Sequence, residues 1–314
     1  MIKSLQYQFI RTFHSILNSF NIDTILNLAY IIGPLYYILS FKNSYKLYKR
    51  KKKFKIYKNL NYKPMTVKIN YVKYWLETLW LTKDNFNKNI MDKVIIKNQK
   101  YIDNLMNSEK GFIFALPHLG NWEMAIPVGK AIGLDLLAVA EPLDNKKVLH
   151  WFKSLREQLG CEIILGGKGQ NTFELLQDKI IKGKHICLLS ERSINKSGVG
   201  VEFFGEVAAF PKGPVALALK TEVPIVPAAF LKLEGRYTLV FDKPFYVPLF
   251  DNEAQSIQQG IKVLAKSFEA LISLDVNQWH SIQPVWTNAV SYTHLRAHET
   301  LRYLVCRLLL EKKK

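Results

Sequence analysis

The sequence predicts an α/β protein in which a mixed, mostly parallel sheet is flanked by helices and preceded by an N-terminal helical, membrane-facing segment. Two observations carry this prediction. From residue 111 onward, short apolar runs of strand length alternate with longer segments that have helical spacing. Before residue 60, an apolar helical stretch is followed by a dense group of lysines. Alternating strands and helices favour a sheet that is covered by helices on both faces.

Composition and cysteine usage bound the class of protein. The chain has 314 residues, of which 48% are hydrophobic, and a formal net charge of +18. This apolar fraction supplies a core and argues against a disordered chain. The sequence has no P-loop, no G-x-S-x-G motif and no Cys/His cluster with metal-ligand spacing, so we expect no metal and no resident cofactor. Cys161 and Cys187 lie in or beside apolar runs, which indicates reduced thiols rather than a disulfide framework.

The last segment, 290–314, does not read as native protein sequence. It resembles the in-frame translation of a transposase-type sequencing adapter that ends in a poly-A run. We therefore exclude it from functional inference, as one excludes a tag, and expect the native chain to continue past Ala289. The segment carries six basic and two acidic residues, so the net charge without it falls from +18 to +14. The remaining chain is still strongly basic.

The N-terminal part begins with an apolar stretch over 5–41. Its most apolar run, 25–39, is shorter than the ~20 residues that a spanning helix needs, and the pair Gly33 and Pro34 interrupts it. We therefore predict an interfacial or re-entrant helix. The residues after this run offer no small-residue cleavage site, so a removable signal peptide is not expected.

A basic cluster follows the apolar stretch. Beside an apolar helix, cations interleaved with aromatic rings suit docking on an anionic membrane surface, at ~1 kcal/mol per near-surface cation. The same pattern suits RNA, because cations meet phosphates and rings stack on bases, and it also arises from compositional bias alone. We favour the membrane surface and expect no nucleic acid. The cluster comprises Lys42, Lys46, Lys49, Arg50, Lys51, Lys52, Lys53, Lys55 and Lys58, with Tyr45, Tyr48, Phe54 and Tyr57.

The rest of the chain is organised as one domain without internal repeats or long linkers. Apolar residues at helical spacing over 71–80 predict a helix that packs under the sheet. Apolar runs predict strands at 112–116, 134–140, 162–165, 185–190, 225–230 and 237–241. Helical spacing predicts helices at 121–132, 146–159, 171–182, 213–220 and 254–274.

The first candidate site lies at the end of the strand predicted at 112–116. His118 follows this strand, and ligand crevices in open α/β sheets form at the carboxyl ends of strands. Glu123 follows after four intervening residues, so a turn into a helix would fold its carboxylate back toward the imidazole. A histidine with such a partner can take a proton from a hydroxyl group. A histidine beside Pro and Gly is equally often a turn residue, and this stretch alone does not decide between the two.

A second apolar strand, predicted at 185–190, ends in Glu191 and Arg192. Both residues would lie at the same sheet edge as His118. Glu191 therefore competes with Glu123 as the partner of His118. The alternative is a surface ion pair at the end of a strand, which is common and contributes little energy.

Four further residues are candidates for binding the substrate. The planar guanidinium of Arg192 suits phosphate oxygens. Lys212 and Gly213 precede a predicted helix, whose free N–H groups favour an anion, although a helix entry without any ligand has the same pattern. Asn121 stands at the start of the helix that follows His118.

Several motifs resemble those of one family. The residues Leu-Pro-His-Leu-Gly-Asn-Trp-Glu at 116–123 resemble its first motif, His followed after four residues by Asp or Glu. The segments that resemble its other motifs, in the same order, are 71–80, 197–206, 210–214 and 278–286. Over roughly 65–286 the chain is similar to the lipid A late acyltransferases, and among them to the phosphatidylinositol mannoside acyltransferases, of the lysophospholipid acyltransferase-like superfamily.

The resemblance implies an O-acyltransferase that moves a fatty acyl chain from a thioester to a glycolipid hydroxyl. It makes His118 the base, ranks Glu191 ahead of Glu123 as its partner and gives Glu123 a more structural part. Backbone N–H groups at 120–122 would stabilise the oxyanion. His280 would be structural rather than catalytic.

The resemblance also implies substrates and a location. In the mannoside branch the donor is acyl-CoA, a co-substrate, and the acceptor is phosphatidylinositol mannoside; the lipid A branch uses acyl carrier protein and a lipid A precursor. We expect the former, on the cytoplasmic face of the plasma (cell inner) membrane, in a peripheral or monotopic protein. The expected domain organisation is an apolar helix with a basic cluster for membrane association over 1–60, an acyltransferase domain over 61–289 and a non-native segment over 290–314. The competing class is a non-catalytic basic protein that binds lipid or RNA.

Overall fold

The computed structural model describes residues 2–166, 171–193, 198–281 and 285–286, except for the side chains of 2, 51–53 and 55–58. The segment 290–314 lies outside these residues. The strands are β1 (Ile95–Lys97), β2 (Ile113–Leu116), β3 (Leu136–Ala140), β4 (Cys161–Leu165), β5 (His185–Leu189), β6 (Val199–Phe203), β7 (Glu206–Phe210), β8 (Ile225–Leu233) and β9 (Arg236–Phe241). A seven-stranded sheet has the order β1-β9-β8-β2-β5-β3-β4, and β6 pairs with β7.

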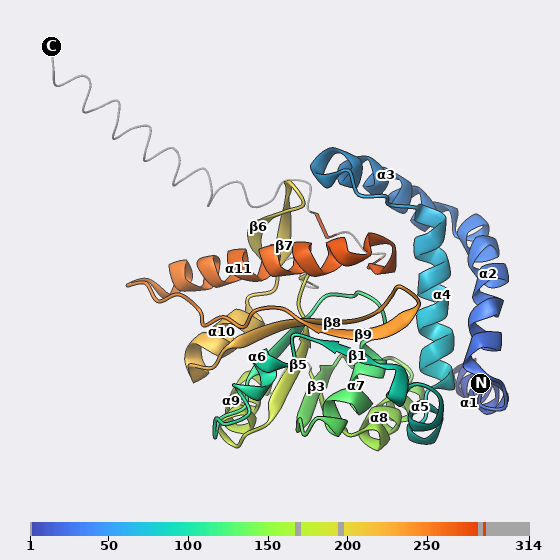
Figure 1. The fold of residues 1–314 in the computed structure, drawn as a ribbon, viewed down its shortest axis with the longest axis horizontal. Helices are drawn as coiled ribbons and strands as arrows, with labels where there is room; N and C mark the ends of the chain where they lie inside the picture. Colours follow the sequence, from blue (N-terminus) through green and yellow to red (C-terminus); the bar gives the residue numbers. More distant parts are fainter. Residues whose placement is uncertain (1, 167–170, 194–197, 282–284, 287–314) are drawn as a thin grey trace, which may run out of the picture.

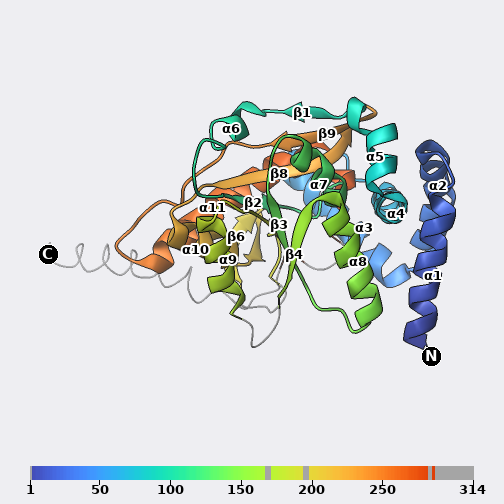
Figure 2. The ribbon, with the colours of Figure 1, turned by 90° about the horizontal axis from the view of Figure 1, so that it is seen from below.

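The large sheet is parallel at every pairing except the antiparallel β8–β9 hairpin. Helices α7 (Trp122–Ala131) and α8 (Lys146–Leu159) pack on one face of it. Helices α9 (Thr172–Ile181), α10 (Gly213–Thr221) and α11 (Glu253–Leu274) pack on the other. Figure 1 shows α11 on one side of the sheet and α7 and α8 on the opposite side, and Figure 2 shows α8 and β4 from below. The predicted fold class is therefore confirmed.

Side chains of the central strand alternate between the two layers. Ile113 and Ala115 of β2 belong to the core beneath α11, whereas Phe112 and Phe114 belong to the core beneath α7 and α8. This alternation follows from the two-residue period of a strand. Because both faces are covered, β2 consists of apolar residues throughout and reads in sequence as a continuous apolar run.

The six predicted strands and the five helices predicted after residue 111 are confirmed. Their observed first and last residues either agree with the predicted ones or differ from them by one to three positions. The sequence reading missed β1, which has only three residues and lies at the sheet edge. It also missed the β6–β7 hairpin, whose turn consists of Phe204 and Gly205 with φ values of 52° and 75°. Shorter elements are α5 (Lys83–Asn89), α6 (Lys100–Asp103) and two 3₁₀ turns, Met91–Lys93 and Val276–Gln278.

Four N-terminal helices stand at one end of the sheet (Figure 1): α1 (Ile2–Leu17), α2 (Ile22–Leu39), α3 (Phe41–Lys58) and α4 (Pro64–Trp80). The expected interruption at Gly33 and Pro34 is wrong, because α2 continues through both residues. Gly33 lets α2 approach α4 closely, since a Cβ there would lie 2.7 Å from the Cα of Ile69. Among the described residues, α2 is the one helix long and apolar enough to cross a membrane, a criterion that buried core helices and signal sequences also meet.

Helix α3 carries the predicted basic cluster, but one side of it is buried. Leu47 and Phe54 are fully buried, and Arg50 is 5% exposed. Nη1 of Arg50 donates to the backbone oxygen of Ser281 at 2.7 Å, and its guanidinium lies 4.6 Å from the ring centroid of Trp279. Arg50 and Phe54 therefore attach α3 to the segment that carries Trp279 and Ser281, and they are not available to a membrane surface.

A buried histidine predicts how stability depends on pH. Burial lowers the pKa of His185 to about 4, and its Nδ1 accepts a hydrogen bond from Phe112 N at 3.4 Å. Between pH 6.5 and 4, the unfolded chain therefore binds a proton that the folded protein does not, so stability falls as the pH falls. His185→Asn should make the melting temperature depend less steeply on pH across this interval. An unchanged slope would contradict this assignment.

Candidate active site

The register of β2 and β5 brings two strand ends together. These parallel neighbours pair Leu116 with Leu189. His118 and Glu191 each stand two residues beyond these partners, so both emerge at the same sheet edge. Ser190 N donates to Leu116 O at 2.9 Å and continues the ladder to this point.

His118 and Glu191 form a hydrogen-bonded pair. Nδ1 of His118 lies 2.5 Å from Oε1 of Glu191, and the backbone N of His118 donates to the same oxygen at 3.1 Å. Burial alone raises the pKa of the fully buried Glu191 carboxyl, but the charge and hydrogen bonds of His118 outweigh it and hold this pKa below its ordinary value. A charged Glu191 keeps the proton of neutral His118 on Nδ1, which leaves Nε2 as the acceptor.

Gly120 fixes the turn between β2 and α7. It has φ +62°, and a Cβ there would lie 2.0 Å from Phe230 O. Gly120 N donates to Gln278 O at 3.0 Å, and Asn121 N donates to Phe230 O at 2.8 Å. The expectation that these backbone groups hold an oxyanion is therefore wrong for both residues, because each N–H is already bonded to a carbonyl.

Glu123 does not contact His118. Its carboxylate forms two hydrogen bonds with Arg156 of α8, 2.8 Å from Nε and 2.6 Å from Nη2. Burial lowers the pKa of Arg156, but the bonds and charge of Glu123 reverse this effect and raise the pKa above its ordinary value. The expectation that Glu123 folds back onto the imidazole is wrong, because α7 directs its side chain toward α8.

Asn121 is also held inside the protein. It is 3% exposed, its Oδ1 caps α7 by accepting from Glu123 N at 3.2 Å, and its Nδ2 donates to Oε2 of Glu77 at 2.9 Å. Tyr237 OH donates to the other oxygen of Glu77 at 2.8 Å. Both polar groups of Asn121 are therefore used within the fold, and the prediction that this side chain binds substrate is not supported by its position.

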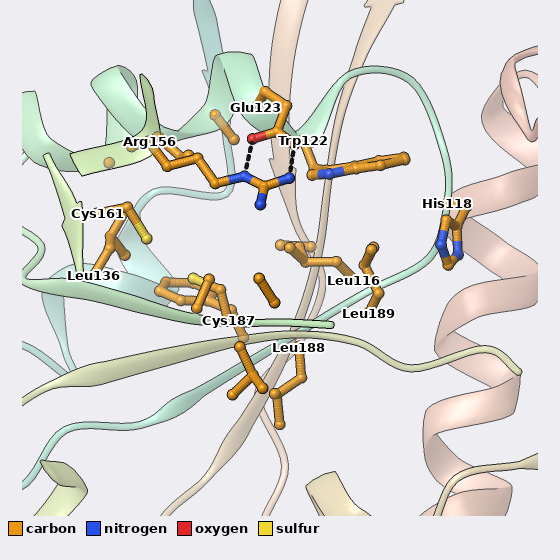
Figure 3. A pocket seen from close by; sticks show the side chains of 18 of the residues that line it. Leu116, His118, Trp122, Glu123, Leu136, Arg156, Cys161, Cys187, Leu188 and Leu189 are labelled. Carbon is orange, nitrogen blue, oxygen red and sulfur yellow. Dashed lines mark hydrogen bonds and ion pairs between the residues drawn. The ribbon is translucent and has the colours of Figure 1, made fainter. Parts of the chain in front are cut away.

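An apolar cavity of about 500 Å³ opens beside His118. Figure 3 shows His118 at one end of this cavity and the Glu123–Arg156 pair along its wall. The free thiols of Cys161 and Cys187 also line it, and burial raises the pKa of Cys161 to about 12, so this thiol stays protonated. Most of the wall is aliphatic or aromatic, including Phe114, Leu116, Ile126, Leu134, Leu136, Leu149, Phe152, Leu188, Leu189 and Phe241. A volume of this size lies within the roughly 300–1,000 Å³ of small-molecule sites.

Arg192 lies at the site, whereas Lys212 and Gly213 do not. Arg192 lines the cavity beside His118. Lys212 and Gly213 are exposed at the start of α10, and neither lines this cavity. The structure therefore brings together only part of the predicted substrate-binding set.

His280 supports the turn that carries His118. Its Nε2 donates to Gly120 O at 2.8 Å, and its backbone N donates to His118 O at 3.2 Å. Burial lowers its pKa to about 4, so the ring is neutral at pH 7. These contacts agree with a structural part for His280.

Sequence reasoning missed the contribution of α4 to the site. Tyr74 and Trp75 line the cavity, and the ring of Tyr74 lies 4.5 Å from that of Trp122. Their helical spacing indicated only packing, and nothing local distinguishes a ring that lines a cavity from one that fills the core. Among the described residues, no group of three or more His, Cys, Asp or Glu is placed to hold a metal ion.

A strand-end His–Glu pair that opens onto an apolar cavity defines a site suited to acting on an acyl chain. The chain belongs to the bacterial lipid A biosynthesis acyltransferase family, whose model matches residues 67–288. It is 30% identical to the phosphatidylinositol mannoside acyltransferase of Mycolicibacterium smegmatis over 220 residues, which are 69% of this chain and 70% of that protein. It is 32% identical over 228 residues to a protein of the same name from Mycobacterium tuberculosis, covering 69% and 68% of the two chains. The resemblance stated above is thereby confirmed.

Proposed function

We propose that this protein transfers a fatty acyl chain from acyl-CoA to a sugar hydroxyl of a glycolipid such as phosphatidylinositol mannoside. The observation that carries the proposal is the hydrogen-bonded pair of His118 and Glu191 at the mouth of an apolar cavity. The relatives named phosphatidylinositol mannoside acyltransferase support the acceptor class.

In the proposed reaction, Nε2 of His118 takes the proton of the acceptor hydroxyl while Glu191 stabilises the imidazolium that forms. The oxygen attacks the thioester carbonyl and gives a tetrahedral intermediate. Its collapse forms the ester and breaks the C–S bond, and the departing thiolate takes the proton from His118. No covalent enzyme intermediate is needed, because a thioester is already activated.

The acyl chain occupies the apolar cavity in this proposal. Ala138 of β3 lines the cavity, so a larger side chain there shortens the space for the chain. We expect Ala138→Phe to lower the ratio of kcat/KM for palmitoyl-CoA over octanoyl-CoA by roughly 10- to 200-fold. The short donor is the internal control, since loss of folding lowers both rates together. An unchanged ratio would place the acyl chain elsewhere.

Membrane association at the cytoplasmic face is part of the proposal. An exposed apolar surface spans the N-terminal helices, and such a surface suits the boundary of a lipid layer. On an anionic leaflet the lysines of α3 add electrostatic attraction. The exposed apolar residues of this surface are Leu5, Phe9, Ile16, Phe20, Leu28, Tyr30, Ile31, Ile32, Leu35, Ile38, Leu39, Phe41, Tyr45 and Tyr48.

The test is to identify the product. Purified protein is incubated with palmitoyl-CoA or with palmitoyl acyl carrier protein, and with phosphatidylinositol mannoside or a lipid A precursor, and the lipids are analysed by mass spectrometry. The proposal predicts acylated mannoside from the CoA donor. Product only from the carrier protein and lipid A precursor would identify the other branch, and no product from any pair would contradict acyl transfer.

A further inference from the structure

Arg50 of α3 is a buried cation that packs against the segment after α11. The residue is 5% exposed, and its guanidinium lies 4.6 Å from the ring centroid of Trp279 and 5.4 Å from that of Trp286. Its Nη1 donates to Ser281 O at 2.7 Å. Two aromatic rings and a carbonyl oxygen therefore fix the orientation of the planar guanidinium. Because an arginine stays charged in proteins, the fold keeps a positive charge at this position.

The segment that Arg50 contacts pairs with the residues around His118. Trp279 and Leu119 form an antiparallel bridge, and His280 N donates to His118 O at 3.2 Å. A shift of this segment would therefore move the imidazole relative to its partner carboxylate. A displacement of about 1 Å can cost roughly 100-fold in rate, so the anchor that holds the segment matters for the reaction.

The carboxylate of Glu191 is close enough to Arg50 for the two charges to interact. Burial lowers the pKa of the Arg50 guanidinium, and the charge of Glu191 acts in the opposite direction. Oε1 of Glu191 accepts from His118, whereas Oε2 is buried and accepts no hydrogen bond from the part of the chain that the structure describes. When His118 is neutral and ready to act as a base, it has no charge to stabilise this buried carboxylate. Arg50 supplies a positive charge in that state.

Arg50 can act on the catalytic pair without touching substrate, because it is not among the residues that line the space beside His118. Burial raises the pKa of Tyr62, next to Arg50, to about 12 and lowers that of His280 to about 4, so both are neutral at pH 7. Other ionisable side chains do line this space, and they stay in place in every variant below. They include Lys46, Tyr74, Glu123, Arg156 and Arg192.

We propose that Arg50 is a positioning residue for acyl transfer, which anchors the segment paired with His118 and supplies buried positive charge that keeps Glu191 ionised while His118 is neutral. Arg50 precedes residues 67–288, which match the family model. Helix α3 then contributes to the chemical step in addition to the proposed membrane association. This inference rests on the proposed function, because it gives Arg50 a part in the same reaction.

The test compares neutral and charged substitutions of Arg50. Two neutral variants are made because one of them can fail to fold: Arg50→Gln keeps a donor for Ser281 O, and Arg50→Met keeps apolar contact with Trp279. Arg50→Lys keeps the charge. Lys49→Met, at an exposed position of the same helix, is the control for loss of one charge. Phe54→Leu is the control for looser packing of α3, since the Phe54 ring lies 5.9 Å from the Trp279 ring.

The kcat/KM for acyl transfer is measured from about pH 5 to about pH 9 in uncharged detergent micelles. Loss of positive charge beside the pair favours the imidazolium of His118, so the pH of half-maximal kcat/KM rises. We expect a rise of about 0.5–1 pH unit in the neutral variants, with a maximum about 10- to 100-fold lower. Arg50→Lys and both controls are expected to stay within about 0.2 pH unit of wild type. A neutral variant with the wild-type midpoint, or controls that shift equally, would overturn the proposal.

A second measurement does not depend on acyl transfer. Diethyl pyrocarbonate modifies a neutral imidazole and not an imidazolium, so the rate of His118 modification, followed by mass spectrometry, reports the same titration. The neutral variants are expected to show the same rise of about 0.5–1 pH unit. If this rise is found but no acceptor is acylated, the proposed function fails and the electrostatic part of Arg50 stands. If acyl transfer is found and neither midpoint moves, the inference about Arg50 fails and the proposed function stands.

Discussion

Replacing Glu191 with glutamine lowers kcat/KM for acyl transfer by about 100- to 10,000-fold while the protein remains folded. The reason is the single oxygen that accepts from both Nδ1 and the backbone N of His118. An amide at this position has no negative charge to stabilise the imidazolium during the reaction. The measurement is the steady-state rate with saturating acyl-CoA and varied glycolipid.

Glu202→Gln is the matched control, because Glu202 is exposed on β6 and does not line the cavity beside His118. This variant should keep the wild-type rate. If Glu191→Gln unfolds near the wild-type melting temperature, its loss of activity comes from the chemical step and not from loss of folding. A Glu191→Gln protein that retains activity within about twofold would remove Glu191 from the mechanism.

Glu123→Gln should act on stability instead. Glu123 is 1% exposed and both of its carboxylate oxygens accept from Arg156, so the change leaves a partly buried guanidinium without its counter-charge. We expect the free energy of unfolding to fall by about 3–5 kcal/mol, measured by urea denaturation at pH 7. Activity should fall only as far as the folded fraction falls.

The double variant Glu123→Leu/Arg156→Met is the control for this effect. Replacing both partners with apolar residues removes the unpaired charge and should restore most of the lost stability. The opposite pattern, a stable Glu123→Gln protein that has lost catalysis, would assign Glu123 to the reaction and contradict the account of Glu191.

The local sequence predicts the fold well because its strands are covered on both faces. Apolar runs such as β2 and β5 are unambiguous where helices bury them completely. The β6–β7 hairpin was missed because its turn uses Phe204, a non-glycine residue with positive φ, which gives no turn signal. The continuation of α2 through Pro34 was missed because its packing on α4 is a tertiary effect.

The site was predicted only where strand ends converge. Two apolar runs place His118 and Glu191 at the same edge of the sheet. Their pairing also requires β2 and β5 to be neighbours, and the sequence does not state this strand order. Arg156 has no local signal, because it meets Glu123 from a different helix.

Thiol release from palmitoyl-CoA tests the central claim most directly. It is measured in vesicles with and without phosphatidylinositol mannoside, for wild-type protein and for His118→Ala. The account predicts release that requires the acceptor and falls at least about 100-fold in the variant. Release that ignores the acceptor, or that survives in His118→Ala, would contradict it.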